Sequence, residues 1–215
     1  GVGKMKILEL FAGTQSIGKA FKDKGHEVFS VEWDKSFENI TLYADILTVQ
    51  ARDIIKRFGY PDVIWASPDC STYSVAAISH HRKQEESGNL APISEYAKFC
   101  DKVNMHVLDL IEELKPKYYF IENPRGGLRK MDFMKGLYRY TVTYCQYGET
   151  RMKPTDIWTN HPDPRFKPMC KNGDSCHEKA PRGSRTGTQG IKGSKERSVI
   201  PKELCNHIVK ICGCE

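Results

Sequence analysis

The chain of 215 residues is long enough for one sizeable domain, or for one domain with a small appendage. Its 39% hydrophobic and 28% charged residues are typical of a soluble globular protein. No apolar run approaches the length that spans a bilayer, and no secretory signal is recognisable, so we expect a cytoplasmic protein with no membrane partner. Eight cysteines in such a chain favour thiols or metal ligands over disulfides.

Strand-like and helix-like segments alternate along most of the chain. In chain order, the spacing of apolar residues predicts a strand at 6–10, a helix at 16–24, a strand at 28–32, a helix at 48–58, a strand at 62–65, a helix at 93–114, strands at 118–122 and 138–145, and a helix at 200–211. Such alternation predicts a parallel sheet with helices on both faces. We therefore expect an α/β fold with a doubly wound, mostly parallel, Rossmann-like sheet.

Two segments break the alternation. Residues 71–92 are polar and are expected to form a long loop, which is usually functional or disordered. Residues 160–196 are rich in glycine and proline and form a small basic insert between a main domain, 5–159, and a helical C-terminal segment, 197–215, that packs back on it. The charge of the insert suits a phosphate backbone, but a solvated, flexible tail fits it equally well.

Three predicted strands are followed by residues that can carry chemistry. The strand at 6–10 opens into a turn that contains Gly13 and Gly18, Cys70 follows the strand at 62–65, and Glu122 ends the strand at 118–122. In an open α/β sheet, ligands and chemistry gather at the carboxyl ends of the strands. The three groups are therefore expected to face one site.

Six short motifs follow one another along residues 5–160: Phe11-Ala12-Gly13, Glu32-Trp33-Asp34, Asp45-Ile46, Pro68 with Cys70 and Ser74, Glu122-Asn123, and Tyr147-Gly148. In kind and order they resemble the motifs of the DNA cytosine-5 methyltransferase family, with a weaker echo at 197–204. The resemblance implies methylation of carbon 5 of cytosine in double-stranded DNA, with S-adenosylmethionine as cofactor and a flipped-out base. The small insert implies a reduced target-recognition region, as in phage members rather than large restriction-modification enzymes.

The cofactor site is expected at the turn after the first strand and at the end of the second. Unpaired backbone amides at the helix start would bind the cofactor carboxylate, and the acidic side chain of Glu32 would bind the ribose. The resemblance places Trp33 against adenine, where core packing is the alternative, and Asp45 at its edge, where a helix cap is the alternative. The full predicted set is Phe11, Ala12, Gly13, Thr14, Gln15, Ser16, Glu32, Trp33, Asp45, Ile46 and Pro68.

One departure from the family concerns that turn. The family usually has paired glycines where this chain has Gln15 and Ser16. Side chains at these positions are expected to narrow the turn around the cofactor.

The reaction is expected to use Cys70 as nucleophile, because addition of a thiolate to carbon 6 of cytosine activates carbon 5. A buried, inert cysteine is the alternative. Glu122 would supply a proton at ring nitrogen 3 if burial keeps its pKa high; pairing with Arg125 is the alternative. The family usually has proline where Asp69 precedes the cysteine, and this carboxylate is expected to raise the thiol pKa.

By resemblance, Arg151 and Lys153 keep positive charge near the phosphate or the base, although the third basic position of the family motif is Thr155 here. The His80-His81-Arg82-Lys83 cluster in the loop at 71–92 is expected to close over an extruded nucleotide.

A structural zinc ion could give the insert a core. Cys170, Cys176 and His177 offer three ligands, and the fourth is left open between His161, Cys205 and another residue. The alternative is free thiols in a loop.

Other functions stay open. Cytosine-5 methylation of RNA would use the same residues on a different substrate. A nucleic-acid-binding relative with weakened catalysis would fit Asp69 and Gln15, whereas an amino-methyltransferase would need neither Cys70 nor Glu122. The sequence does not indicate an oligomeric state.

Overall fold

The computed structural model describes residues 3–178 and 199–213. The predicted basic stretch within 179–198, together with the start of the echo at 197–204, lies outside the described residues. The main sheet has the strand order β3-β2-β1-β4-β7-β9-β8, and β5 and β6 form a separate hairpin. The strands are β1 (Lys6–Leu10), β2 (Glu27–Glu32), β3 (Leu42–Tyr43), β4 (Val63–Ala66), β5 (Arg82–Gln84), β6 (Leu90–Pro92), β7 (Tyr118–Pro124), β8 (Arg139–Thr143) and β9 (Pro154–Thr159).

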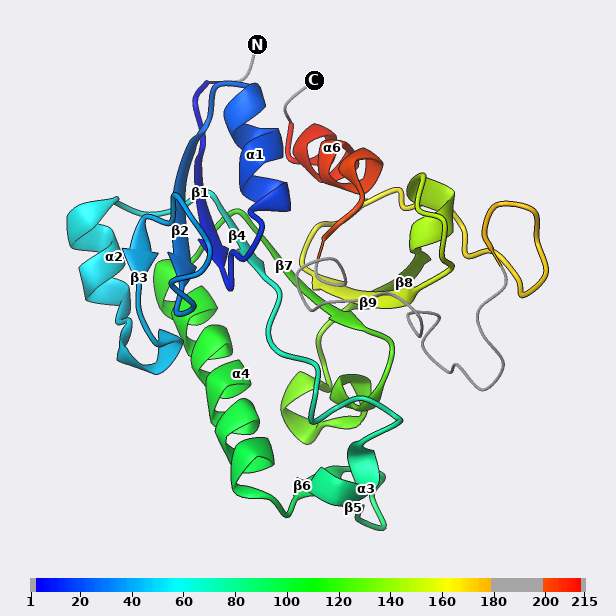
Figure 1. Ribbon diagram of the computed structural model, residues 1–215. Coiled ribbons are helices and arrows are strands. Elements are labelled where there is room, and N and C mark those ends of the chain that lie inside the picture. Colours follow the sequence, from blue (N-terminus) through cyan, green and yellow to red (C-terminus); the bar gives the residue numbers. More distant parts are fainter. Residues whose placement is uncertain (1–2, 179–198, 214–215) are drawn as a thin grey trace.

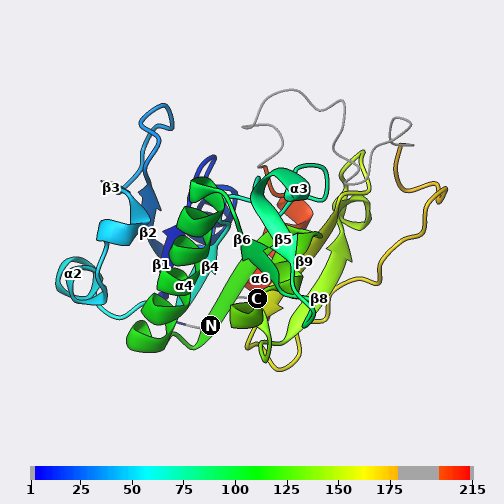
Figure 2. The ribbon, with the colours of Figure 1, turned by 90° about the horizontal axis from the view of Figure 1, so that it is seen from below.

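Helices cover both faces of this sheet. The α-helices are α1 (Ser16–Asp23), α2 (Ala51–Arg57), α3 (Ile78–His81), α4 (Glu95–Leu114) and α6 (Lys202–Ile211). Short 3₁₀ helices are η1 (Ile46–Thr48), η2 (Gly127–Lys130), η3 (Asp132–Met134) and η4 (Tyr144–Tyr147). Figure 1 shows α1 and α6 side by side, and in the view of Figure 2 the helix α4 crosses the sheet.

Alternation along the strands explains the two layers, because successive side chains of a strand point to opposite faces. Ile7 of β1 packs in the apolar cluster shared with α1 and α6, whereas its neighbour Leu8 packs in the cluster shared with α2 and α4. In the same way Val63 and Ile64 of β4 divide between the two clusters. The two clusters are the cores on the two faces of the sheet.

Four strand pairs are parallel, and the pairs that involve β9 are antiparallel. The prediction of a doubly wound, mostly parallel α/β sheet is confirmed. The sequence analysis missed β9, since its polar residues hide the strand pattern. Asp156 of β9 is buried because Arg129 pairs with it, at 2.6 Å between Nη2 and Oδ1.

The polar segment 71–92 is not a simple loop, so that prediction is wrong. It contains α3 and the β5–β6 hairpin, and Arg82 anchors it to α4. The guanidinium of Arg82 lies 2.7 Å from the carboxylate of Asp101 and 4.1 Å from the ring centroid of Tyr73, and all three side chains are buried. Of the His80-His81-Arg82-Lys83 cluster that was expected to close over a nucleotide, Arg82 therefore points into the interior instead.

The C-terminal helix α6 packs on α1, and the amide of Ile200 just before it donates to Ser16 Oγ at 3.3 Å. Residues 160–178 contain neither helix nor strand and run past the β8 end of the sheet, far from α2 (Figure 1). None of the helices in the described ranges, 3–178 and 199–213, has the length and apolar character needed to cross a membrane.

Candidate active site

A cavity of about 340 Å³ opens at the carboxyl ends of β1, β2 and β4. This volume lies at the lower end of the range typical of small-molecule sites. Six of the predicted cofactor residues line it: Phe11, Glu32, Trp33, Asp45, Ile46 and Pro68. Four more, Ala12, Gly13, Thr14 and Ser16, line a smaller cavity of about 60 Å³ that shares Phe11 with the first. Most of the predicted cofactor set therefore surrounds one region.

Glu32 ties the end of β2 to the turn after β1. One carboxylate oxygen accepts a hydrogen bond from the Gly13 amide at 3.0 Å, and the other accepts one from the Asp34 amide at 3.0 Å. Each oxygen has a second lone pair, so the carboxylate still has acceptor capacity for a ligand hydroxyl. The two amides fix its orientation beside the cavity.

For Trp33 and Asp45, the alternatives to a cofactor role were core packing and helix capping, and the structure decides these two cases differently. The indole of Trp33 is 72% exposed, which excludes the core-packing alternative, and it borders the cavity. Asp45 caps η1, since Oδ1 accepts a hydrogen bond from the Leu47 amide at 3.0 Å, and it also lines the cavity. The helix-cap alternative is therefore correct for Asp45 without excluding a ligand role.

The turn between β1 and α1 uses left-handed backbone conformations, with φ of 55° at Phe11, 50° at Gly13 and 62° at Gln15. Glycine tolerates such angles without strain, so the family preference for glycine has a backbone reason at Gln15. The side chain of Gln15 donates to the Glu38 carbonyl at 2.8 Å and lines neither cavity. Gln15 in place of glycine therefore strains the backbone, and its side chain does not narrow either cavity.

The helix α4 supplies cavity residues that the sequence analysis did not identify as site residues: Tyr96, Phe99, Cys100, Val103 and Asn104. The rings of Tyr96 and Phe99 stack at 6.1 Å with an angle of 17° between their planes, and both are at least 40% exposed. Two aromatic residues three positions apart at the start of a long helix were the available signal. Only the packing of α4 across the sheet shows that they face a cavity.

Cys70 and Glu122 come from neighbouring strands. β4, which precedes Cys70, pairs in parallel with β7, which contains Glu122. The Asn123 side-chain amide donates to the Pro68 carbonyl at 2.9 Å and so links the two strand ends. The charge of Glu122 contributes to the raised pKa of the Cys70 thiol. The structure thus brings the predicted nucleophile and acid to one place.

Cys70 is half-buried, and its surroundings disfavour the thiolate. Burial raises the pKa of the Cys70 thiol to about 11, with further contributions from the charges of Asp69 and Glu122, while Lys153 lowers it. The effect of Asp69 has the expected direction, although its carboxylate accepts hydrogen bonds from the Ser71 amide at 2.7 Å and from the Tyr96 hydroxyl. The thiol needs a change in its surroundings, or a bound ligand, to ionise near neutral pH.

Glu122 is buried, and burial raises the pKa of its carboxyl group. Lys153 and hydrogen bonds from Ser67 and Tyr144 oppose that rise, with the Tyr144 hydroxyl 3.1 Å from Oε1. Lys153 is itself buried, and its ammonium group lies 5.1 Å from the centre of the Tyr144 ring. Arg151 has a guanidinium nitrogen 3.8 Å from the Glu178 carboxylate. Lys153 lowers the pKa of both Cys70 and Glu122.

The three predicted metal ligands Cys170, Cys176 and His177 do meet. The fourth member of the cluster is Cys145, which is neither His161 nor Cys205 but the further residue that the sequence analysis left open. His161 Nε2 lies 2.6 Å from the Ile211 carbonyl oxygen, and the Cys205 thiol donates to the Ile200 carbonyl. Cys145 was missed because it was assigned to a strand, whereas β8 ends two residues before it and η4 turns its side chain toward the insert.

Comparison with known proteins identifies the family of the chain. Residues 5–139 match the model of the family described as C-5 cytosine-specific DNA methylase. Over 226 aligned positions the chain is 27% identical to a protein of Frog virus 3 (isolate Goorha) named as a probable DNA (cytosine-5)-methyltransferase, with 97% of this chain and 100% of that protein covered.

Solved structures share the fold. A candidate DNA modification methyltransferase encoded within an E. coli prophage matches with a TM-score of 0.51 and 17% identity over 73% of this chain and 46% of its own. The Entamoeba histolytica methyltransferase EhMeth matches with a TM-score of 0.52 and 13% identity over 74% of this chain and 53% of its own. The chain thus spans about half the length of these structures. Because the family model covers more than half of the sequence, the chain belongs to the C-5 cytosine-specific DNA methylase family and is a methyltransferase.

Proposed function

We propose that the protein methylates carbon 5 of cytosine in double-stranded DNA, through a covalent bond between Cys70 and a flipped-out base. The observation that carries the proposal is the meeting of Cys70 and Glu122 at the ends of two paired strands, with the buried Lys153 acting on both. A nucleophile and a proton donor next to one another are what addition to a pyrimidine ring requires.

The cavity beside this pair fits S-adenosylmethionine. Trp33 offers an exposed aromatic face for adenine, and Glu32 offers acceptor oxygens for the ribose hydroxyls. The turn over Ala12, Gly13 and Thr14 leads into α1, whose first amides suit a carboxylate. When bound, the cofactor supplies an electrophilic methyl group on a sulfonium sulfur.

The proposed reaction begins at Cys70. Its thiolate forms a bond to carbon 6 of cytosine while the Glu122 carboxyl gives its proton to ring nitrogen 3, so the electron pair of the 5,6 double bond becomes available at carbon 5. Carbon 5 then takes up the methyl group, whose bond to sulfur breaks so that a neutral thioether is left. Loss of the carbon 5 proton to a base in the solvent expels the thiolate, and nitrogen 3 returns its proton to Glu122. The ring regains its aromatic character and both residues return to their starting state.

Lys153 has two effects in this scheme. Its positive charge lowers the pKa of the Cys70 thiol and favours the nucleophile. It also lowers the pKa of Glu122, which works against the proton donor. Burial is the largest contribution at both residues, so Glu122 keeps a raised pKa in spite of Lys153.

Reaching the base inside a duplex requires base flipping, at a cost of a few kcal/mol. We assign DNA rather than RNA because the family model and the Frog virus 3 relative are both described as acting on DNA. That relative is viral and the prophage structure is of phage origin, so we place the enzyme in the cytoplasm of a host cell that carries a viral or phage genome.

The test is to incubate the protein and S-adenosylmethionine with duplex DNA or RNA that carries 5-fluorocytosine, whose fluorine cannot leave as the carbon 5 proton does. We expect a covalent protein–DNA adduct that resists denaturing electrophoresis and maps to Cys70 by peptide mass spectrometry. Cys70→Ala should form no adduct, whereas Cys212→Ala, which removes a buried thiol at the end of α6, should form it as the wild type does.

The RNA arm decides the substrate, since an adduct with RNA and none with DNA would contradict the assignment to DNA. No adduct with either nucleic acid, from a protein that binds DNA, would identify a non-catalytic relative. An adduct that persists in Cys70→Ala would refute the nucleophile.

A further inference from the structure

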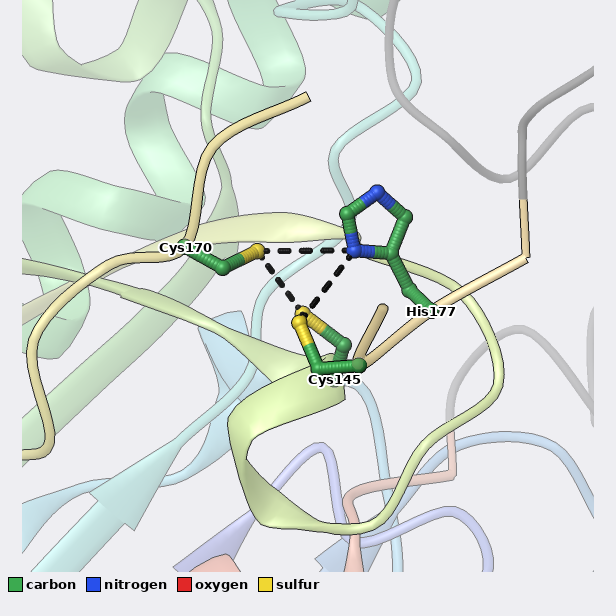
Figure 3. Close-up of side chains that lie close together, drawn as sticks. Cys145, Cys170 and His177 are labelled. Atoms are coloured by element: carbon green, nitrogen blue, oxygen red, sulfur yellow. Dashed lines mark hydrogen bonds between the residues drawn. The ribbon is translucent and has the colours of Figure 1, made fainter. Parts of the chain in front are cut away.

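A cluster of three thiols and one imidazole lies between η4 and the segment 160–178, outside the reaction site. Figure 3 shows the side chains of Cys145, Cys170 and His177 pointing toward one another. The sulfur of Cys145 lies 2.9 Å from that of Cys170 and 3.3 Å from that of Cys176. His177 Nδ1 lies 3.6 Å from the Cys170 sulfur and 3.4 Å from the Cys176 sulfur. We propose that these four side chains bind one zinc ion and thereby fix the segment 160–178 on η4.

The distances suit a tetrahedral ion. Zinc bonds of about 2.3 Å to sulfur and 2.0 Å to nitrogen place two sulfurs about 3.8 Å apart, and a sulfur and a nitrogen about 3.5 Å apart. The separations between His177 and the two sulfurs already match, and all four ligand atoms lie within 4.8 Å of one another. The sulfurs of Cys145 and Cys170 need to separate by less than about 1 Å. Three cysteines and one histidine are a common ligand set of structural zinc sites.

The chemistry of the cluster favours an ion over free thiols. Cys145 and Cys170 are buried, and a thiol is a weak partner for another thiol. A disulfide between Cys145 and Cys170 would not explain why Cys176 and His177 lie next to the same two sulfurs. Residues 160–178 have no helix or strand to hold them together, and binding of a metal ion supplies folding free energy to such segments.

Hydrogen bonds of the protein hold the ligands close before any ion binds. The Cys170 amide donates to Thr143 Oγ1 at 3.0 Å, and the side chain of Gln146 donates to the Pro168 carbonyl at 3.1 Å. These bonds place Cys170 against η4, which carries Cys145. A turn closed by Asp174, whose carboxylate accepts from the Lys171 amide at 2.7 Å, then returns the chain to Cys176 and His177.

The site borders the substrate side of the enzyme. Tyr144, next to Cys145, donates a hydrogen bond to Glu122, and Glu178, next to His177, bonds through its amide to the Thr150 carbonyl at 2.6 Å and pairs with Arg151. An ion held by four protein ligands has no open position for catalysis, so its role is structural. A bound zinc ion would therefore help to hold two side chains in position: Tyr144, which donates to the proposed acid Glu122, and Arg151, which is predicted to bind the substrate.

The test measures metal content directly. The full chain is purified with a reducing agent in zinc-containing medium and dialysed, and zinc is determined by inductively coupled plasma mass spectrometry. We expect about one zinc ion per chain. Cys176→Ala, which removes a half-buried ligand, should lose most of the zinc, His177→Cys should retain it, and Cys212→Ala should bind as much as the wild type.

Two further measurements guard against a variant that merely misfolds. Cobalt added to the stripped wild-type chain should give the absorption of tetrahedral thiolate-bound cobalt. A chelator should lower the thermal midpoint of the wild type and leave that of Cys176→Ala unchanged.

Wild-type protein with less than about a tenth of a zinc ion per chain and no such cobalt spectrum would overturn the proposal. A Cys145–Cys170 disulfide in the reduced preparation, or unchanged zinc in Cys176→Ala, would do so as well. These results are independent of methylation: zinc without a fluorocytosine adduct would refute the proposed function and leave the metal site standing.

Discussion

The cofactor cavity and the reaction site lie next to each other but are built on different principles. The cavity is lined mainly by apolar and aromatic side chains, and the carboxylate of Glu32 is held in place by two backbone amides. The reaction site contains a thiol, a buried carboxyl and a buried lysine: Glu122 raises the pKa of Cys70, and Lys153 lowers the pKa of both. Changes in the first region should therefore alter binding, and changes in the second should alter reactivity.

The two departures from the family also differ in their physical effect. Gln15 replaces a glycine at the rim of the cavity, and its side chain lies outside both cavities. Asp69 replaces a proline at the reaction site, and its charge acts directly on Cys70. A substitution at the rim costs local backbone strain, whereas a charge at the reaction site changes the ionisation of the nucleophile.

The largest effect is expected for Glu122→Gln, which removes the proton donor and keeps the shape. We expect kcat for methyl transfer to fall by about 10²- to 10⁴-fold. Because the pKa of Glu122 is raised, the carboxyl keeps its proton to higher pH than an ordinary glutamate. Above that pKa, loss of the Glu122 proton should offset the gain of Cys70 thiolate, so the wild-type rate should level off. The rate of the variant, measured with labelled cofactor, should keep rising with pH over the same range. Unchanged activity would remove Glu122 from the reaction.

Trp33→Ala tests the cofactor cavity. Stacking of a base on an aromatic ring contributes about 1–3 kcal/mol, so the Kd for S-adenosylmethionine in isothermal titration calorimetry should rise about tenfold. The free energy of unfolding should change by less than about 0.5 kcal/mol, because Trp33 is 72% exposed. Tyr138→Ala removes a comparably exposed ring, 77% exposed, at a position that does not line the cavity, and should leave Kd unchanged. Equal losses in both variants would contradict a specific stacking role.

Lys153→Met and Asp69→Asn should shift the pKa of the Cys70 thiol in opposite directions. Lys153 lowers the thiol pKa and Asp69 raises it, so at pH 8 alkylation of Cys70 by iodoacetamide should slow in the first variant and speed up in the second, by roughly three- to tenfold each. Peptide mass spectrometry reads out the rate at Cys70 alone. The exposed Lys102→Met and Asp109→Asn serve as charge-matched controls. Shifts of the same sign in both variants would show that packing, rather than charge, governs the thiol.

The smallest effect is expected for Gln15→Gly. Relief of the left-handed conformation, φ 62°, should raise the free energy of unfolding by up to about 1 kcal/mol, measured by urea denaturation. Gln50→Gly is a matched control, because Gln50 also precedes a helix but has an ordinary φ of −105°. A gain of the same size in both variants would rule out backbone strain as the cause.

Much of the fold was predictable because its elements are regular. The strand at 6–10 agrees with β1 in both bounds, and the helix predicted at 93–114 differs from α4 only at its start. β9 was not predictable from spacing, since the burial of Asp156 depends on Arg129 from another part of the chain. The segment 71–92 was mistaken for a loop for the same reason: Arg82 is buried only because Asp101 of α4 neutralises it.

The sequence by itself determined the family, the parallel sheet, and the presence of Cys70 and Glu122 at strand ends, because local motifs and apolar periodicity record these features. Only the tertiary structure decided which residues share a site. It brought α4 to the cofactor cavity, the charge of Lys153 to both reacting groups, and Cys145 to three ligands at least 25 positions away. Such meetings depend on how layers pack and where strands end, and no single stretch of sequence contains that information.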